Sequence, residues 1–239
     1  MIRCVVFDFD GTLVDSNAIK RQAFYDVVQD FDPSGATMER VLNGPNPGDR
    51  FEVMRGVADL LARAGRLPPA RDPQAWADVW ADTFGRICEE SITGAREIPG
   101  ASETLRWLRE RGATLFVSSA TPQAALERVV ARRDLAPLFT AVHGRPAGKP
   151  EHLCAIARRT GVTPSDVLMV GDGEDDRQAA LAFGCPFVGI AQSNNGRFAA
   201  PPQHRIVDLH ALRPLCEHIG GIGPLKSNAG ETRVAARSR

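Results

Sequence analysis

Residues 5–16 read VVFDFDGTLVDS, an apolar run that ends in two aspartates separated by a single residue. The β-branched and aromatic residues before Asp8 are typical of a buried strand. Asp8 and Asp10 would bring two like charges close together where the strand ends, and such charges repel each other unless a cation lies nearby. The stretch therefore predicts a strand that carries carboxylates to one edge of a sheet, with a metal ion as a candidate for the compensating charge. Either aspartate alone would also suit an Asx turn.

Short β-branched runs alternate with longer stretches of helical periodicity along most of the chain. This order is typical of a parallel sheet with helices on both faces, so the sequence predicts an α/β fold. The expected strands cover residues 4–7, 114–118, 140–143, 167–170, 187–190 and, with a weaker pattern, 206–207.

From residue 16 to residue 97 the alternation stops, because this segment contains no convincing strand pattern. Two helical stripes of apolar residues run through it instead, one from Ile19 to Val28 and one from Trp76 to Cys88. Ser16 is a good N-cap for the first helix. We therefore expect an α-helical domain inserted just after the first strand. The expected boundaries are 1–15 and 98–222 for the core, 16–97 for the inserted domain and 223–239 for a disordered tail without apolar periodicity.

The composition limits the partners that we expect. Twenty-nine basic and twenty-nine acidic residues balance to a formal net charge of zero, so the chain has no overall field that would attract nucleic acid or an anionic membrane. No apolar stretch reaches the ~18 residues of a membrane span, and MIRCVVFDFD at the N-terminus lacks the pattern of a signal peptide. The five scattered cysteines are typical of reduced thiols. We expect a cytoplasmic monomer or homodimer that acts on a small molecule, with no nucleic-acid or membrane partner.

Further polar residues follow the later strands. Ser119 lies in VSSATP after the second strand, Lys149 lies in GKPEH before the fourth, and Asp172 lies in VGDGEDD after the fourth. Alone, Ser119 would suit a helix cap, Lys149 a solvated cation and Asp172 an acidic loop. Ligands bind beyond the carboxyl ends of parallel strands, however, so consecutive βα units would bring these side chains to the same edge as Asp8 and Asp10. The joint arrangement favours a functional site.

In order, DFDGTLVDS, VSSATP, the lysine of GKPEH and VGDGEDD resemble the four motifs of the haloacid dehalogenase superfamily. The helical insertion resembles the C1-type cap of that family, and the likeness covers roughly residues 1–220. The resemblance implies a Rossmann-like three-layer core with an inserted cap. It also implies a role for each motif residue: Asp8 as nucleophile, Asp10 as general acid/base, Ser119 and Lys149 as phosphate ligands, Asp8, Asp172 and the Asp10 backbone carbonyl as Mg²⁺ ligands, Asp176 as a supporting acid, and Thr12 and Ala120 as further substrate contacts.

Phosphoryl transfer would explain why these residue types occur together. A phosphoryl group is densely negative, so the Asp8 carboxylate can approach it only if cations such as Mg²⁺ and Lys149 reduce the repulsion. Mg²⁺ prefers oxygen ligands, and the sequence has no histidine or cysteine cluster that competes for it. In this superfamily the dehalogenases lack the second aspartate, so Asp10 favours phosphoryl transfer. Asp176 would orient the metal shell or hold Lys149, although an acid there also suits the dipole of a helix N-terminus.

Candidate specificity residues lie in the helical insertion. The loop LNGPNPGDR, residues 42–50, is rich in glycine and proline and resembles the specificity loop of C1 caps. In this loop Gly44 and Arg50 are candidates for substrate contact, and Arg50 would either bind a second anionic group or simply begin the next helix. Lys20 stands where related phosphoglucomutases often carry a histidine. It would either contact an acidic substrate or be a solvated helix residue.

The function that we predict is a Mg²⁺-dependent phosphatase that hydrolyses a small phosphorylated metabolite, of the phosphoglycolate or sugar phosphate type, through an aspartyl-phosphate on Asp8. Asp10 would protonate the leaving oxygen and then activate the attacking water. One alternative is a β-phosphoglucomutase-like sugar phosphate isomerase, which would use the same aspartates but protect the phosphoenzyme from water. The other is a non-catalytic binding protein that keeps the fold.

Overall fold

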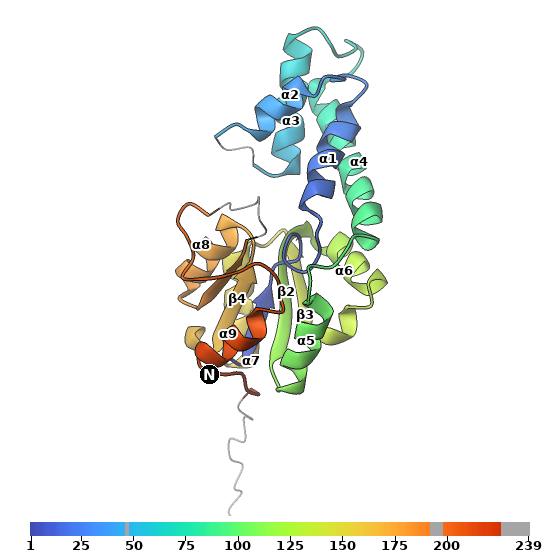
Figure 1. Ribbon diagram of the computed structural model, residues 1–239. Coiled ribbons are helices and arrows are strands. Elements are labelled where there is room, and N and C mark those ends of the chain that lie inside the picture. The colour runs from blue at the N-terminus through green and yellow to red at the C-terminus, as the bar shows by residue number, and fades with distance from the viewer. Residues whose placement is uncertain (46–47, 192–197, 226–239) are drawn as a thin grey trace, which may run out of the picture.

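The computed structural model describes residues 1–45, 48–191 and 198–225, and Figure 1 shows a sheet flanked by helices with further helices standing above one edge. Within the described residues, six strands form one sheet in which neighbouring strands are parallel, in the order β3-β2-β1-β4-β5-β6. The predicted α/β class is confirmed. The strands are β1 (Cys4–Phe7), β2 (Thr114–Pro122), β3 (Ala141–Arg145), β4 (Val167–Gly171), β5 (Phe187–Ile190) and β6 (His204–Ile206).

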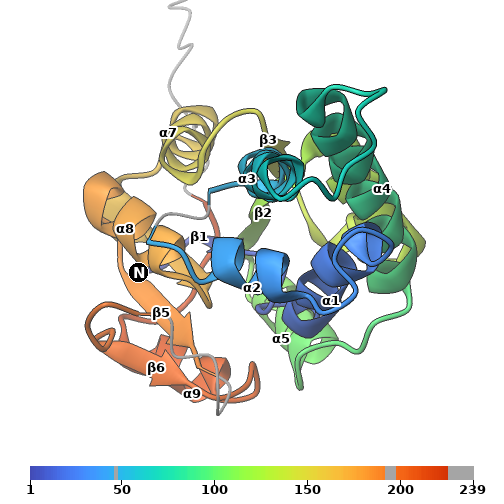
Figure 2. The ribbon, with the colours of Figure 1, turned by 90° about the horizontal axis from the view of Figure 1, so that it is seen from above.

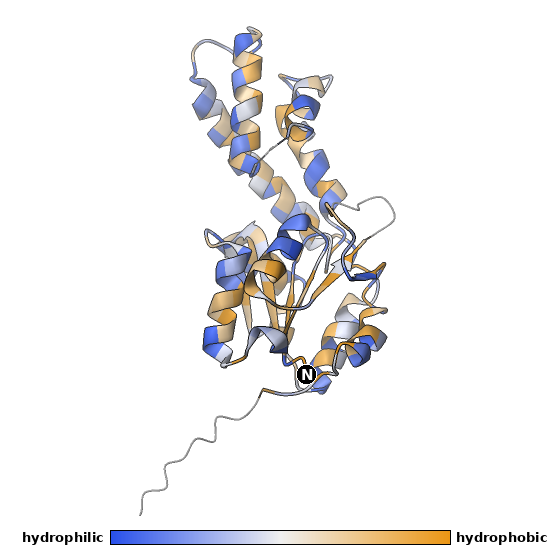
Figure 3. Ribbon diagram, turned by 90° about the vertical axis from the view of Figure 1, so that its left-hand side faces the viewer, coloured by the Kyte–Doolittle hydropathy of each residue, from blue (hydrophilic) through white to orange (hydrophobic). Residues whose placement is uncertain are grey.

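Strand β1 lies inside the sheet and is fully buried, because its four residues are apolar and both of its faces are covered. Val5 and Phe7 pack into one apolar layer while Cys4 and Val6 pack into the other, as the two-residue period of a strand requires. Figure 3 shows the strands as a largely hydrophobic layer between helices of mixed character.

Helices cover both faces of the sheet and complete the three layers. Figure 2 shows α7 and α8 on one side of the sheet and α5 on the other. Apolar residues of α5, α6 and α9 pack with Val5 and Phe7, whereas those of α7 and α8 pack with Cys4 and Val6. The helices of the core are α5 (Ala101–Glu110), α6 (Gln123–Arg132), α7 (Lys149–Thr160), α8 (Glu174–Phe183) and α9 (Leu212–His218), with short 3₁₀ turns at Ala136–Leu138 and Pro164–Asp166.

The register of the sheet aligns the ends of its central strands. Phe7 pairs with Val117 of β2 on one side and with Val170 of β4 on the other. The residues that follow Phe7 and Val170 therefore emerge at the same level, where loops can carry side chains to a common ligand. This edge is the one that faces the additional helices (Figure 1).

Four helices lie between β1 and α5, and we call them the helical insertion: α1 (Asn17–Val28), α2 (Ala36–Leu42), α3 (Arg50–Arg63) and α4 (Pro73–Thr93). Aromatic rings join its helices, since Phe24 of α1 stacks on Phe84 of α4 with ring centroids 4.2 Å apart. The division of the chain into a core and a cap at residues 16 and 97 stays a proposal. The predicted tail lies outside the described residues from 226 onward.

The start of the insertion differs from the prediction in one respect. Ser16 occupies the N-cap position of α1, but its side chain makes no capping hydrogen bond. Its hydroxyl instead donates to Asp10 Oδ1 at 2.6 Å. A charged acceptor makes the stronger hydrogen bond, so Ser16 serves the strand end rather than the helix end. Separately, no helix among residues 1–45, 48–191 and 198–225 has both the length and the apolar character needed to cross a membrane.

Candidate active site

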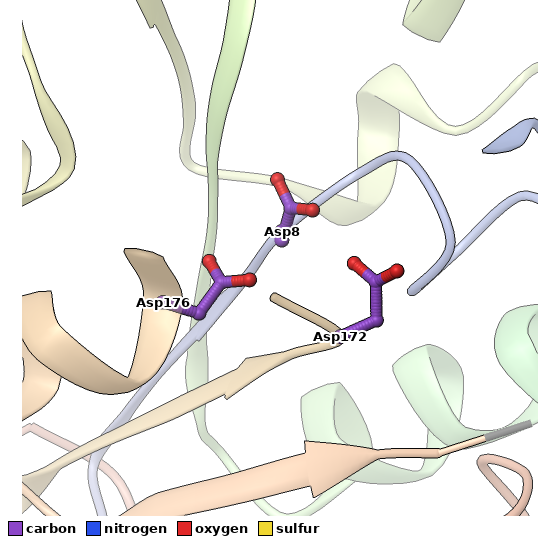
Figure 4. Close-up of side chains that lie close together, drawn as sticks. All are labelled: Asp8, Asp172 and Asp176. Atoms are coloured by element: carbon purple, nitrogen blue, oxygen red, sulfur yellow. The ribbon is translucent and has the colours of Figure 1, made fainter. Parts of the chain in front are cut away.

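Three aspartates meet at the carboxyl edge of the sheet. Asp8 follows β1 and its backbone NH donates to the carbonyl of Val170 at 2.8 Å, which fixes it beside β4. Asp172 follows β4, and Asp176 lies in the first turn of α8. One carboxylate oxygen from each of these aspartates lies within 4.8 Å of the others, and Figure 4 shows the three side chains converging. We call Asp8, Asp172 and Asp176 the carboxylate cluster.

Lys149 supplies the positive charge beside this cluster. It is the first residue of α7, and its buried Nζ lies 3.3 Å from Asp8 Oδ1 and 2.5 Å from Asp176 Oδ1. A third carboxylate, that of Asp175, lies 2.8 Å from the same nitrogen. Burial alone would lower the pKa of Lys149, but the surrounding carboxylates raise it well above the usual value. Lys149 is therefore held as a cation.

One lysine does not balance the negative charge of the cluster. Burial, opposed by Lys149 and reinforced by the neighbouring aspartates, raises the pKa of Asp8 well above the usual value. Burial also raises the pKa of Asp172, although Asn17 Nδ2 donates to its Oδ2 at 2.7 Å. The pKa of Asp176 is raised to about 7, again mainly by burial. An additional cation would relieve this repulsion, and clustered carboxylate oxygens are the donors that Mg²⁺ prefers.

Asp10 has a different environment although it is only two residues from Asp8. Its carboxylate accepts hydrogen bonds from Ser16 at 2.6 Å, from Thr121 Oγ1 at 3.1 Å and from Lys20 Nζ. Burial tends to raise the pKa of Asp10, but the charge of Lys20 and these three hydrogen bonds lower it below the usual value. Environments that push two neighbouring carboxyl groups in opposite directions are typical of sites where the two have different roles.

Gly11 allows Asp8, Asp10 and Asp172 to approach one another. Its φ of +75° lies in the left-handed region that side chains disfavour. A Cβ at this position would also lie 2.2 Å from both Asn17 Nδ2 and Asp172 Oδ2. The glycine in DFDGT is therefore required both by the turn and by the contact between the insertion and the core.

The residues predicted to bind phosphate lie along this edge with different partners. Ser119 is buried, and its hydroxyl accepts a hydrogen bond from the backbone NH of Thr121 at 3.1 Å. The adjacent Ser118 is engaged elsewhere, since its hydroxyl lies 2.8 Å from His152 Nδ1. Thr12 is fully buried, and its hydroxyl has no hydrogen-bond partner among the described residues. The unpaired Thr12 hydroxyl makes this part of the loop suitable for a polar ligand.

A cavity of about 420 Å³ extends from Asp10 beneath the insertion, and we call it the insertion cavity. Lys20, Arg50 and Ala120 all line it, so these three predicted residues border the same cavity beside Asp10. Gly44 does not line it and lies in the loop after α2, next to residues 46–47, which are outside the described part. Arg50 begins α3, and its guanidinium lies 4.7 Å from the centroid of the Phe51 ring.

Four site residues were not predicted to act there. Ser16 and Thr121 donate to Asp10, Asn17 donates to Asp172, and Asp175 forms an ion pair with Lys149. Thr121 and Asp175 lie inside the VSSATP and VGDGEDD motifs, so their position in the sequence was a usable signal. Asn17 crosses from the insertion to the core, a contact that depends on how the two parts meet and has no sequence pattern.

A model of the haloacid dehalogenase-like hydrolases matches residues 2–184. The chain belongs to this family. Among curated haloacid dehalogenase-like relatives, phosphoglycolate phosphatase of Pseudomonas putida is 31% identical over 222 residues, which cover 90% of this chain and 79% of the relative. Phosphoglycolate phosphatase of Salmonella typhi is 31% identical over 212 residues, covering 81% and 83% of the two chains. The predicted family and class of enzyme, a phosphatase-type hydrolase, are confirmed.

Solved structures of haloacid dehalogenase-like proteins share the fold. The crystal structure of a predicted phosphoglycolate phosphatase from Haemophilus somnus has a TM-score of 0.71 at 21% identity, covering 90% of this chain and 97% of the other. L-2-haloacid dehalogenase from Xanthobacter autotrophicus has a TM-score of 0.59 at 24% identity, covering 91% and 99%. One fold thus carries both activities, so the choice between them depends on side chains rather than on architecture.

Proposed function

We propose that the protein is a Mg²⁺-dependent phosphatase that hydrolyses a small phosphorylated metabolite through an aspartyl-phosphate on Asp8. The observation that carries the proposal is the carboxylate cluster beside the buried Lys149, with Asp10 two residues from Asp8 and in contact with Thr121. A dehalogenase would need no acid for its leaving group, so a second carboxylate held at this position supports phosphoryl transfer.

The residues present suit a magnesium ion, which would supply positive charge next to the phosphoryl oxygens. Asp8, Asp172 and the backbone carbonyl of Asp10 would hold it, because all three offer hard oxygen donors at one strand edge. Asp176 would act mainly through Lys149, to which it is bonded at 2.5 Å. The phosphate would be bound by Ser119, Thr12, Ala120 and Lys149. We assign these residues because they lie around the ends of β1 and β2.

In the first step an oxygen of the Asp8 carboxylate forms a bond to phosphorus while the bond from phosphorus to the ester oxygen breaks. Asp10 gives its proton to that leaving oxygen. In the ligand-free arrangement Lys20 holds Asp10 in the ionised form. The negative charge of a bound phosphoryl group would raise the pKa of Asp10 and so favour the protonated form that the first step needs.

In the second step Asp10 takes a proton from water as the water oxygen forms a bond to phosphorus. The bond between phosphorus and Asp8 breaks, which restores the carboxylate and releases inorganic phosphate. Thr121 and Ser16 orient Asp10 throughout, because each donates to one of its two oxygens. The same carboxyl group thus serves as acid and then as base.

The helical insertion would select the substrate. Lys20 and Arg50 line the cavity beside Asp10 and are the candidates for contacts with the leaving group; Gly44 would act only through the course of its loop. The curated relatives named phosphoglycolate phosphatase make phosphoglycolate the first ester to test, followed by sugar phosphates.

The test is a phosphate-release assay over a panel of metabolite monoesters, run with Mg²⁺ and again with EDTA. We expect release that requires Mg²⁺ and is lost with EDTA. A folded protein that releases phosphate from no ester would contradict the proposal. Conversion of a hexose 1-phosphate into its 6-phosphate without net release would point to the isomerase instead.

A further inference from the structure

The insertion cavity has walls that differ from the charged edge of the sheet. Its side nearest the sheet carries Asp10, Lys20 and Thr121, where the leaving oxygen of a substrate would lie. Most of the remaining wall is apolar and comes from both parts of the molecule: Phe9, Phe24, Phe84, Cys88 and Ile92 on one side, and Pro122, Ala125, Leu126 and Val129 of the α6 region on the other.

The cavity is too large for the leaving group of phosphoglycolate. Its volume of about 420 Å³ is many times the ~30 Å³ share of one water molecule in the liquid. A two-carbon hydroxy acid would leave most of this space filled with solvent. Apart from the cations Lys20, Arg50 and Arg145, the wall would offer its carboxylate mainly aromatic and aliphatic side chains, where a charge without a partner is costly.

The polar groups of the cavity are largely engaged with other groups of the protein. Lys20 binds Asp10, Asp49 caps α3 and Glu89 forms a two-bond ion pair with Arg128. A sugar would need several free donors and acceptors for its hydroxyl groups. Among the described residues of the cavity wall, Arg50 is the cation without an ion-pair partner, and its Nε is buried without a hydrogen bond.

Small residues leave room at two places in the cavity wall. Gly85 lies within helix α4, where glycine is unfavourable by ~1 kcal/mol relative to alanine, and a Cβ there would lie 3.2 Å from Arg50 Nη1, so this glycine makes room for the Arg50 guanidinium. On the facing helix α6, Ala125 lines the cavity whereas its neighbour Ala124 is exposed. A larger side chain at either lining position would occupy the room that a substrate needs.

From these observations we propose that the preferred substrate is the phosphate monoester of a bulky, mainly apolar alcohol, which occupies the insertion cavity and leaves toward it. The proposal rests on the proposed phosphatase function and narrows its substrate class. Burial of the alcohol against Phe24, Phe84 and Val129 supplies the binding energy, and Arg50 accommodates one acceptor group if the alcohol carries one.

The experiment compares ethyl, butyl and hexyl phosphate with phosphoglycolate on the full chain with Mg²⁺. The alkyl esters have leaving groups of similar basicity, so their kcat/KM values differ mainly through binding. We expect kcat/KM to rise along the series by up to about fourfold per methylene group and to exceed that of phosphoglycolate for hexyl phosphate.

Variants that fill the insertion cavity test whether the dependence of kcat/KM on alkyl length arises there. Ala125→Phe should reduce the ratio of kcat/KM for hexyl phosphate to that for ethyl phosphate at least about tenfold, whereas the same substitution at exposed Ala124 should leave the ratio unchanged. Gly85→Leu fills the facing wall and should act like Ala125→Phe. A flat series, or a ratio that Ala125→Phe and Gly85→Leu leave intact, overturns the inference while the phosphatase function stands. Absence of phosphate release from every ester, in protein that remains folded, overturns both.

Discussion

The two sides of Asp10 have opposite chemistry. Toward the sheet lies the carboxylate cluster, where charged groups are buried within a few ångströms of one another. Toward the insertion lies a cavity with mainly apolar walls. The charged side comes from the ends of β1 and β4 and the first turns of α7 and α8, and would suit any phosphate ester. The apolar side comes mainly from α1, α4 and α6 and would suit only certain alcohols. Under the proposed function, reaction and selection would therefore lie on opposite sides of Asp10.

Substitution of Asp8, the proposed nucleophile, should abolish the hydrolysis of every ester. For Asp8→Asn we expect kcat to fall by at least ~10⁴-fold, because the amide cannot attack phosphorus. The variant should fold, because Asp8→Asn replaces a carboxyl group that is costly to bury in its charged form, as its raised pKa indicates. The matched control is Asp15→Asn, an exposed aspartate, which should keep full activity. Activity retained in Asp8→Asn would refute the assignment of Asp8.

Substitution of Asp10 should have a smaller effect that depends on the alcohol. Asp10→Asn removes the proton donor, and general acid–base catalysis contributes about 10²–10⁴-fold. The loss in kcat/KM, which reports the first step, should be large for alkyl phosphates and much smaller for p-nitrophenyl phosphate, whose leaving group needs little protonation. The measurement is kcat/KM for both esters in the variant and the wild type. An equal loss in kcat/KM for both esters would show that Asp10 does not protonate the leaving oxygen.

Substitution of Arg50 should weaken the binding of some substrates in the insertion cavity and leave the chemical step unchanged. We expect Arg50→Met to raise KM about tenfold for esters whose alcohol carries a carboxylate, the magnitude of one charge-assisted hydrogen bond. KM for uncharged alkyl phosphates and kcat for both kinds of ester should change little. Arg40→Met, at an exposed arginine of α2, is the control. Unchanged KM for the carboxylate esters would exclude Arg50 from substrate binding.

Mg²⁺ bound at the carboxylate cluster should raise the free energy of unfolding measurably. Saturation to about 100 times Kd contributes about 2.7 kcal/mol, which corresponds to a rise in Tm of about 5–10 °C for a chain of this size. Asp172→Asn should remove most of this rise. Differential scanning calorimetry with Mg²⁺ and with EDTA measures it, and an equal rise in Asp172→Asn would place the ion elsewhere.

The rise in Tm caused by Mg²⁺ should increase with pH. Burial raises the pKa of Asp8 and Asp172, so the metal-free folded state holds protons that the unfolded state has lost. The stability of the metal-free protein should therefore fall as the pH rises from the usual carboxyl pKa through the raised pKa values of these two groups. The ion competes with these protons, so the rise in Tm should be larger at pH 8 than at pH 5.5. A rise that does not change with pH would mean that these carboxylates are not the ligands.

The sequence was sufficient for the parts that depend on local pattern. The run before Asp8 and the βα alternation predict the sheet, because a buried parallel strand must be apolar on both faces. The motif residues Asp8 and Asp172 meet because the register aligns the ends of β1 and β4, and Lys149 reaches Asp8 from the first position of α7. Each of these placements follows from which strand a residue ends or which helix it begins.

The parts that depend on how helices pack against the core could not be predicted. Lys20 was expected to be solvated or to contact substrate, and its ion pair with Asp10 across the junction between insertion and core was not foreseen. Ser16 was expected to cap α1, and a nearby carboxylate takes its hydroxyl instead. The apolar cavity combines residues from α1, α4 and α6, whose apolar character in the sequence is indistinguishable from that of core residues.

The most direct measurement is a rapid acid quench of the enzyme during turnover with Mg²⁺, followed by mass spectrometry of the peptide that contains Asp8. Asp10→Asn should help, because slower hydrolysis lets the intermediate accumulate. The account predicts a phosphoryl adduct on Asp8 that appears before free phosphate and disappears when substrate is exhausted. Phosphate release at the normal rate with no adduct on this peptide, or with an adduct on another residue, would contradict it.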